Sequence, residues 1–317
     1  VGVLQRPRFA HLTHRRKRQY GLGKGPYHPC QTPSLASPMG PCGLRVVAHH
    51  MAQRVDLLGT GNAFLPRGRL HSMALLDGQH LIDASPTALI ALRRVGRSPA
   101  DLRTILITHL HGDHVFGLPF LLLERKYISD RTGDNPLRIV CAPGAFERVR
   151  HLCNLAYPGS LDGLLDAVEV VEVAEGRLEG GWSYARFEVH HDDAVDPHGY
   201  RFVHDDGAEW LHSGDSGPCA ALESHVAQVS MAVVEMGVPD WVDTDHHHTP
   251  KDVVALANRH PEVRFVVTHT FADDEGPGPD IVSAPIPDMP VNVHLARDGE
   301  AWSWTGECWV AHVKDST

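Results

Sequence analysis

Short apolar runs separated by glycine, proline and polar turns recur along the chain from residue 51 onwards. Apolar or alternating runs of this length are typical of β-strands. They predict single strands at VDLLGTG (55–61), LRTILITH (102–109), LRIVCAP (137–143), AVEVVEV (167–173), WSYARFEVH (182–190), SMAVVEMG (230–237) and VRFVVTHT (263–270).

Hairpins and helices occupy much of the remaining sequence. HSMALLDGQHLIDAS (71–85) has two apolar runs joined at Asp77-Gly78, a strong signal for a β-hairpin. Further hairpins are predicted over residues 199–215 and 291–304, and helices over residues 85–96, 144–157 and 249–260. Ser85 is expected to cap the first helix, and Thr249 and Asp252 have capping-box spacing at the third.

Strands therefore dominate residues 51–317, and helices occur in both halves of this region. Each sheet must bury an apolar face, so two sheets covered by helices are the natural arrangement. Because no linker divides the region, the pattern predicts one α/β domain from Met51 to Thr317.

The first fifty residues differ in composition. They carry eight of the 29 Lys and Arg residues and no Asp or Glu, which leaves 21 basic and 39 acidic residues, a net charge of −18, for residues 51–317. They are rich in Pro and Gly and show no helical or strand period, so we expect residues 1–50 to be a disordered tail. A transit peptide and a nucleic-acid contact through HRRKR are alternatives for this segment.

The composition, 42% hydrophobic and 21% charged residues, is that of a soluble globular protein. No apolar stretch has the length of a transmembrane helix, so no membrane association is expected. The six cysteines include no CxxC pair, which argues against a zinc ribbon or a thioredoxin-like motif. Scattered cysteines without a signal peptide lead us to expect a cytoplasmic protein.

Candidate metal ligands crowd the segment THLHGDHVFGLP (108–119), directly behind a predicted buried strand. His109 and His111 alternate by two, and a turn at Gly112 brings Asp113 and His114 back beside them. Imidazole and carboxylate groups suit zinc, manganese or iron. The segment therefore predicts a metal site that can present ligands to two ions.

More candidate ligands follow other predicted strands: His190 or His191, Asp215 and His269. Loops at strand ends converge on a common site in layered folds, so we expect these side chains to join the first four.

These motifs resemble the metallo-β-lactamase superfamily, whose HxHxDH motif corresponds to His109, His111, Asp113 and His114. The sequence is most similar to the ribonuclease Z-like branch, through LLGTGNAF, THLHGDHVFGLP, HGYRF, HSGDS, HHHTPKDVVALA and VVTHT, which occur in the same order. The resemblance covers residues 51–317. It implies a four-layer αββα sandwich that holds two divalent metal ions, zinc first, with manganese or iron as alternatives.

The resemblance also implies a role for each residue. His109, His111 and His191 would form one metal site, Asp113, His114 and His269 the other, and Asp215 would bridge them. The choice between His190 and His191 stays open, with His191 preferred, and Asp83 resembles an aspartate that supports the ligands.

Catalysis in this branch uses a water shared by the two ions, which lower its pKa towards neutrality. Asp113 is both a ligand and a proton acceptor in this prediction. His248 matches the histidine that approaches the scissile group, and Glu235 matches the carboxylate paired with it. That pairing would let His248 assist the leaving oxygen. His246 and His247 have no assigned role.

The expected substrate is a small phosphodiester. Ribonuclease Z carries a basic, glycine-rich arm between the GYR element and the bridging aspartate, whereas FVHDDGAEWLHSG (202–214) here is a short acidic hairpin. A body with a net charge of −18 would also repel RNA, because Lys and Arg supply most nucleic-acid affinity.

Three alternatives remain: ribonuclease Z activity on precursor tRNA, hydrolysis of a carboxylic ester, lactone or thioester, and a non-catalytic metal-binding protein. The oligomeric state is also open, and a homodimer is one arrangement considered.

Overall fold

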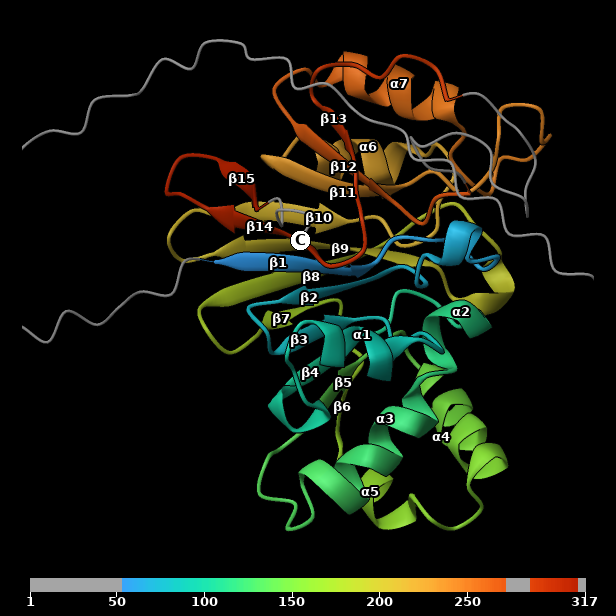
Figure 1. Ribbon diagram of the computed structural model, residues 1–317, viewed down its shortest axis with the longest axis vertical. Helices are drawn as coiled ribbons and strands as arrows, with labels where there is room; N and C mark the ends of the chain where they lie inside the picture. Colours follow the sequence, from blue (N-terminus) through green and yellow to red (C-terminus); the bar gives the residue numbers. More distant parts are fainter. Residues whose placement is uncertain (1–52, 272–285, 313–317) are drawn as a thin grey trace, which may run out of the picture. The chain divides into compact units, whose positions relative to one another are not determined.

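Two β-sheets lie face to face in the computed structural model, which describes residues 53–271 and 286–312 (Figure 1). Within these residues one sheet has eight strands, in the order β15 (Trp309–His312), β14 (Glu300–Trp304), β1 (Arg54–Gly59), β2 (Met73–Leu76), β3 (His80–Ile82), β4 (Thr104–Leu106), β5 (Arg138–Val140) and β6 (Glu169–Val171). The other described sheet has seven, in the order β13 (Val293–Leu295), β12 (Arg264–Thr268), β11 (Met231–Glu235), β10 (Glu209–His212), β9 (His198–His204), β8 (Trp182–Glu188) and β7 (Glu175–Arg177).

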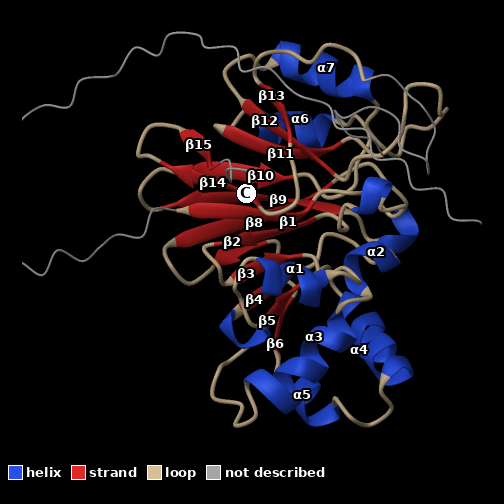
Figure 2. Cartoon of the chain, viewed as in Figure 1, coloured by secondary structure: helices blue, strands red, loops and turns tan. Residues whose placement is uncertain are grey.

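Helices cover the outer face of each sheet (Figure 2). The first sheet packs against α1 (Ala88–Arg94), α3 (Leu118–Glu124), α4 (Ala145–Ala156) and α5 (Asp162–Ala167). The second sheet packs against α6 (Ala220–Val226) and α7 (Pro250–Arg259). The short helix α2 (Gly112–Val115) lies in the connection between β4 and α3.

Strand alternation explains these layers. Leu81 and Ile105 face the helices of the first sheet, whereas their neighbours Ile82 and Leu106 face the second sheet. Side chains of successive strand residues point to opposite faces, so each central strand contributes to two apolar layers. A third layer lies between the second sheet and α6 and α7. The predicted αββα sandwich is therefore confirmed.

Two local predictions are confirmed. Asp77 and Gly78 both have positive φ, 49° and 71°, as the tight turn between β2 and β3 requires. Thr249 and Asp252 form the predicted capping box at the start of α7.

Two local predictions were wrong. Helix α1 begins at Ala88 with Thr87 at its N-cap, because Ser85 instead makes a turn in which its carbonyl oxygen accepts from the Ala88 N–H at 2.9 Å. The hairpin predicted over 291–304 does not form. β13 pairs in parallel with β12 in one sheet, and β14 pairs with β1 in the other.

The carboxyl ends of several strands meet at one edge of the sandwich. β10, β11 and β12 run parallel, and β8 has the same direction because two antiparallel pairings link it to β10. β4 ends at the same place in the first sheet, between the parallel strands β3 and β5. Most of the predicted site residues follow these strands.

The predicted tail, residues 1–50, lies outside the described residues. Within the described part of the chain, no helix has the length and apolar character needed to cross a membrane.

Candidate metal centre

The seven predicted ligands come together in two groups that share one residue. His109, His111, His191 and Asp215 form one group, and Asp113, His114, Asp215 and His269 form the other. Within each group the candidate ligand atoms lie within 4.8 Å of one another. Asp215 belongs to both groups, which is the position expected of a bridging carboxylate.

The structure also places His191, and not His190, beside the other candidate ligands. The His191 side chain is buried and its Nε2 lies 3.1 Å from His111 Nδ1, whereas His190 is exposed and turned away. Adjacent residues in extended backbone point in opposite directions, so only one of the pair can enter the site.

The backbone turns sharply at two positions that deliver site residues. Helix α2 starts at Gly112 and brings Asp113 and His114 back towards His109. His269 has a φ of 46°, an uncommon value for a non-glycine residue, directly after β12 ends. Non-glycine residues held in this region cluster at functional sites.

Three of the histidines have the ring nitrogen remote from the centre fixed by a hydrogen bond. His114 Nδ1 donates to Asp83 Oδ2 at 2.7 Å, and His191 Nδ1 donates to the His246 carbonyl at 3.0 Å. His109 Nδ1 lies 3.0 Å from Thr108 Oγ1. That hydroxyl donates to Asp83, so it accepts from His109. Each ring therefore directs Nε2 towards the centre as a lone-pair donor, the arrangement that orients metal-binding histidines.

This tautomer pattern fits a cation between the rings. His111 Nδ1 lies 3.2 Å from His109 Nε2 and 3.1 Å from His191 Nε2. Among the described residues, buried His114 Nε2 and Asp215 Oδ1 make no hydrogen bond, although they lie only 3.4 Å apart. Buried polar atoms in native proteins normally have partners, so these atoms fit a role as metal ligands.

The charges of His109 and Asp215 agree with this role. Burial lowers the pKa of His109 well below its usual value, which keeps the ring neutral. Burial alone would raise the pKa of Asp215, but the neighbouring His269 and His114 lower it well below its usual value. A neutral imidazole and an ionised carboxylate are the forms that bind metals. Burial opposes protonation of His114 and His269, but the neighbouring carboxylates outweigh it and raise both pKa values, that of His269 to about 10, so an ion that binds must displace a proton from each ring.

Asp83 occupies the supporting position suggested by the sequence. Its carboxylate accepts from the Thr108 N–H and hydroxyl, both at 2.8 Å, and from His114 Nδ1. The residue has a φ of 62° and is fully buried. It therefore holds Thr108, the residue before His109, together with His114.

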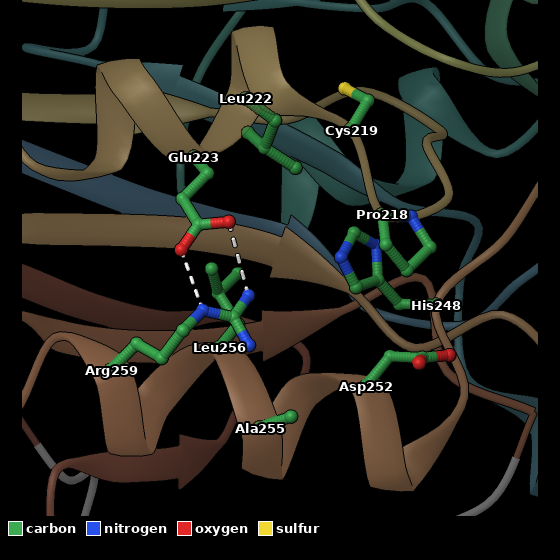
Figure 3. A pocket seen from close by; sticks show the side chains of 9 residues that line it. All are labelled: Pro218, Cys219, Leu222, Glu223, His248, Asp252, Ala255, Leu256 and Arg259. Atoms are coloured by element: carbon green, nitrogen blue, oxygen red, sulfur yellow. Dashed lines mark hydrogen bonds and ion pairs between the residues drawn. The ribbon is translucent and has the colours of Figure 1, made fainter.

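The predicted pair of Glu235 with His248 is wrong. His248 donates from Nδ1 to the Ser216 carbonyl at 2.5 Å, and its ring lines a pocket between α6 and α7, with Cys219 and Asp252 (Figure 3). Because Thr249 caps α7 in an extended conformation, His248 points towards the helix layer and the preceding residue points towards the metal centre.

His247 takes the position that the sequence interpretation gave to His248. Its Nδ1 donates to Glu235 Oε1 at 2.8 Å, and its ring centroid lies 4.8 Å from that of His191 and 6.0 Å from that of His269. Glu235 is fully buried and also accepts from the Ser216 and Gly237 N–H groups. Burial lowers the pKa of His247, but the Glu235 charge outweighs it and raises that pKa.

A family model for the beta-lactamase superfamily domain matches residues 79–270. The chain belongs to this superfamily. Within the superfamily it falls in the ribonuclease Z-like branch. It is 31% identical to ribonuclease Z of Mycobacterium avium over 240 residues, 68% of this chain and 85% of the relative.

Two further proteins are similar to this chain over different lengths. The anti-Pycsar protein Apyc1 of Paenibacillus sp. is 43% identical over 83 residues, which are 26% of this chain but only 34% of Apyc1. The metallo-beta-lactamase fold protein YhfI of Bacillus subtilis superposes with a TM-score of 0.62 at 15% identity, covering 80% of this chain and all of YhfI. The likeness to YhfI shows a shared fold.

Proposed function

We propose that this superfamily hydrolase holds two divalent metal ions and cleaves a small phosphodiester. Zinc is the preferred metal, and manganese and iron are the alternatives. The observation that carries the proposal is the placement of the His247–Glu235 pair beside the candidate ligands His191 and His269. A site that only stored metal would need no such pair.

The ligands would be the two groups of residues described above, with Asp215 shared between them. Bound ions would supply an activated water at neutral pH and neutralise charge that develops on the substrate. The rest of the chemistry belongs to the chain's own side chains.

Asp113 is a partly buried candidate ligand, and in this proposal its carboxylate accepts a proton from the attacking water. His247 is 23% exposed in its side chain, whereas its partner Glu235 is fully buried. The buried carboxylate holds the ring through Nδ1 and favours the protonated form, which leaves Nε2 free to donate a proton to a leaving oxygen.

A charged imidazole beside the centre also favours an anionic substrate over a neutral ester. The size of that substrate is suggested by the β9–β10 connection. Residues 205–208 close it as a tight turn in which the His204 N–H donates to the Ala208 carbonyl at 2.8 Å. The basic arm expected of a precursor-tRNA nuclease has no place in this connection.

Ribonuclease Z activity is the second candidate, because the M. avium relative carries that name and matches most of the chain. The acidic balance of residues 51–317, 39 acidic against 21 basic residues, argues against the grip on RNA that it needs.

Steady-state hydrolysis of bis-p-nitrophenyl phosphate by the zinc-loaded protein, beside cleavage of a precursor tRNA at physiological salt, tests the proposal. We expect turnover of the phosphodiester and little cleavage of the tRNA. Efficient and accurate tRNA cleavage with weak phosphodiester turnover would favour ribonuclease Z. Activity on lactones or thioesters alone would favour carboxyl-ester chemistry, and no turnover of any substrate would favour a non-catalytic protein.

A matched pair of variants tests the role of His247. His247→Gln should lower kcat about 10²- to 10⁴-fold with metal content retained, since it removes the proton donor. His248→Gln keeps the neighbouring histidine and should have a much smaller effect on kcat. The reverse order would restore His248 to the catalytic role.

A further inference from the structure

A second group of metal-binding side chains lies outside the seven-residue centre. His190, Asp245 and His246 place their candidate ligand atoms within 4.8 Å of one another, and all three are exposed. His190 Nε2 lies 3.1 Å from Asp245 Oδ2, and His246 Nε2 lies 3.6 Å from Asp245 Oδ1. Two imidazole rings therefore converge on the two oxygens of one carboxylate.

The backbone brings these residues together independently of their side chains. The Gly217 N–H donates to the His190 carbonyl at 2.8 Å, in a β-bridge between the two residues. A Cβ atom at Gly217 would lie 1.6 Å from the Asp245 carbonyl oxygen, so only glycine permits this approach. Gly217 thus packs the segment with His190 against the segment with Asp245.

The third residue is fixed by the metal centre itself. The His246 carbonyl accepts from His191 Nδ1 at 3.0 Å, and the His246 N–H donates to Thr244 Oγ1 at 3.2 Å. The cluster is therefore built on backbone contacts, and its two segments continue directly into His191 and His247.

The chemistry of the cluster suits a zinc-type ion. Two imidazoles and one carboxylate are a known three-ligand set for zinc, in which water fills the remaining position. Magnesium prefers oxygen ligands and binds such a set poorly. The exposed ion pairs alone would add little to stability, because water screens surface charges.

We propose that His190, Asp245 and His246 form a third metal site, selective for zinc-type ions and weaker than the binuclear centre. Its ion holds residues 190–191 against residues 245–247. Occupancy of this rim site therefore reinforces the relative positions of His191 and His247, which the backbone contacts of Gly217 and His246 already set. The site does not depend on the identity of the substrate.

Zinc binding to the full chain tests the rim site. Protein loaded with zinc is passed through gel filtration to remove loosely held ions, and is then titrated with zinc chloride in an equilibrium dialysis. We expect one further equivalent per chain, and none when magnesium chloride replaces zinc. Asp245→Asn replaces a carboxylate ligand with a neutral amide, and His190→Gln removes an imidazole ligand. Each should weaken this equivalent by more than about tenfold, at least as much as the loss of a group that only supports a ligand.

His151→Gln is the matched control, because His151 is an exposed histidine on α4 outside this cluster. It should keep the additional equivalent. Asp245 is 80% exposed in its side chain, and surface substitutions of this kind usually change stability by less than about 0.5 kcal/mol. An additional equivalent that keeps its affinity in both rim variants, or no additional equivalent at millimolar zinc, overturns the proposal.

Discussion

Replacing Asp83 with asparagine tests how the chain orients its metal ligands. The carboxylate accepts three hydrogen bonds, from the Thr108 N–H, the Thr108 hydroxyl and His114 Nδ1, at 2.7 to 2.8 Å. Asparagine has the same shape but carries one NH₂ group in place of an oxygen. Either orientation of that amide places the NH₂ group against a donor.

The size of the effect follows from these contacts. A hydrogen bond to a charged group contributes about 1.5–3 kcal/mol, and a buried group left without its partner costs a similar amount. This corresponds to about 10- to 100-fold in an equilibrium constant, the range found when groups that support metal-bound histidines are removed. We therefore expect Asp83→Asn to weaken zinc binding at the His114 site about 10- to 100-fold.

Competition against a chromogenic zinc chelator measures this affinity, and Asp77→Asn provides a matched control. Asp77 also has a positive φ, 49°, and its carboxylate accepts from the Arg54 N–H and Trp182 Nε1, both at 2.7 Å. It should lower the free energy of unfolding and leave zinc affinity unchanged. A wild-type zinc affinity in Asp83→Asn, or an equal loss in Asp77→Asn, would refute the reasoning.

Two predictions concern stability. Burial lowers the pKa of His212 to about 4, and its Nδ1 accepts from the Gly214 N–H, so the folded protein holds the neutral ring. The unfolded chain takes up a proton near pH 6.5, and this contribution is lost as the pH falls below that value. Urea unfolding should therefore show about 1.3 kcal/mol less stability from this group at about pH 5.5 than at about pH 7.5, a difference absent in His212→Gln. Thr249→Ala removes the cap of α7 and should cost about 1 kcal/mol in the same assay; no change would mean that the cap is dispensable.

The convergence of the candidate ligands could be predicted because most of them follow predicted strands. His109 follows β4, Asp215 follows β10 and His269 follows β12, and the carboxyl ends of these strands meet at one edge. The spacing within HxHxDH is local, so a short helix suffices to complete it.

The sequence did not identify which histidine pairs with Glu235. Three consecutive histidines precede the Thr249 cap, and sequence alone does not say which one faces the sheet and which faces the helices. The decision comes from tertiary contacts, in which Ser216 binds His248 and leaves His247 to Glu235. Alternation of side chains indicates that His247 faces the opposite way from His246 and His248, but it does not say which side faces the sheet.

The prediction of a hairpin over residues 291–304 was wrong for a related reason. A turn at Asp298-Gly299 between two apolar runs is a strong local signal, but β13 and β14 belong to different sheets. Asp298 instead accepts from the Thr60 and Leu70 N–H groups, which ties this connection to the loop after β1. Contacts between residues more than 200 positions apart overrode the local pattern.

The metal content of the purified chain, measured by mass spectrometry of the elements after gel filtration in chelator-free buffer, tests the binuclear centre most directly. The seven converging side chains predict close to two equivalents of zinc, manganese or iron per chain, and fewer in Asp215→Ala, because the shared ligand is lost. A reproducible value of one equivalent or less in the wild-type protein would contradict the binuclear centre.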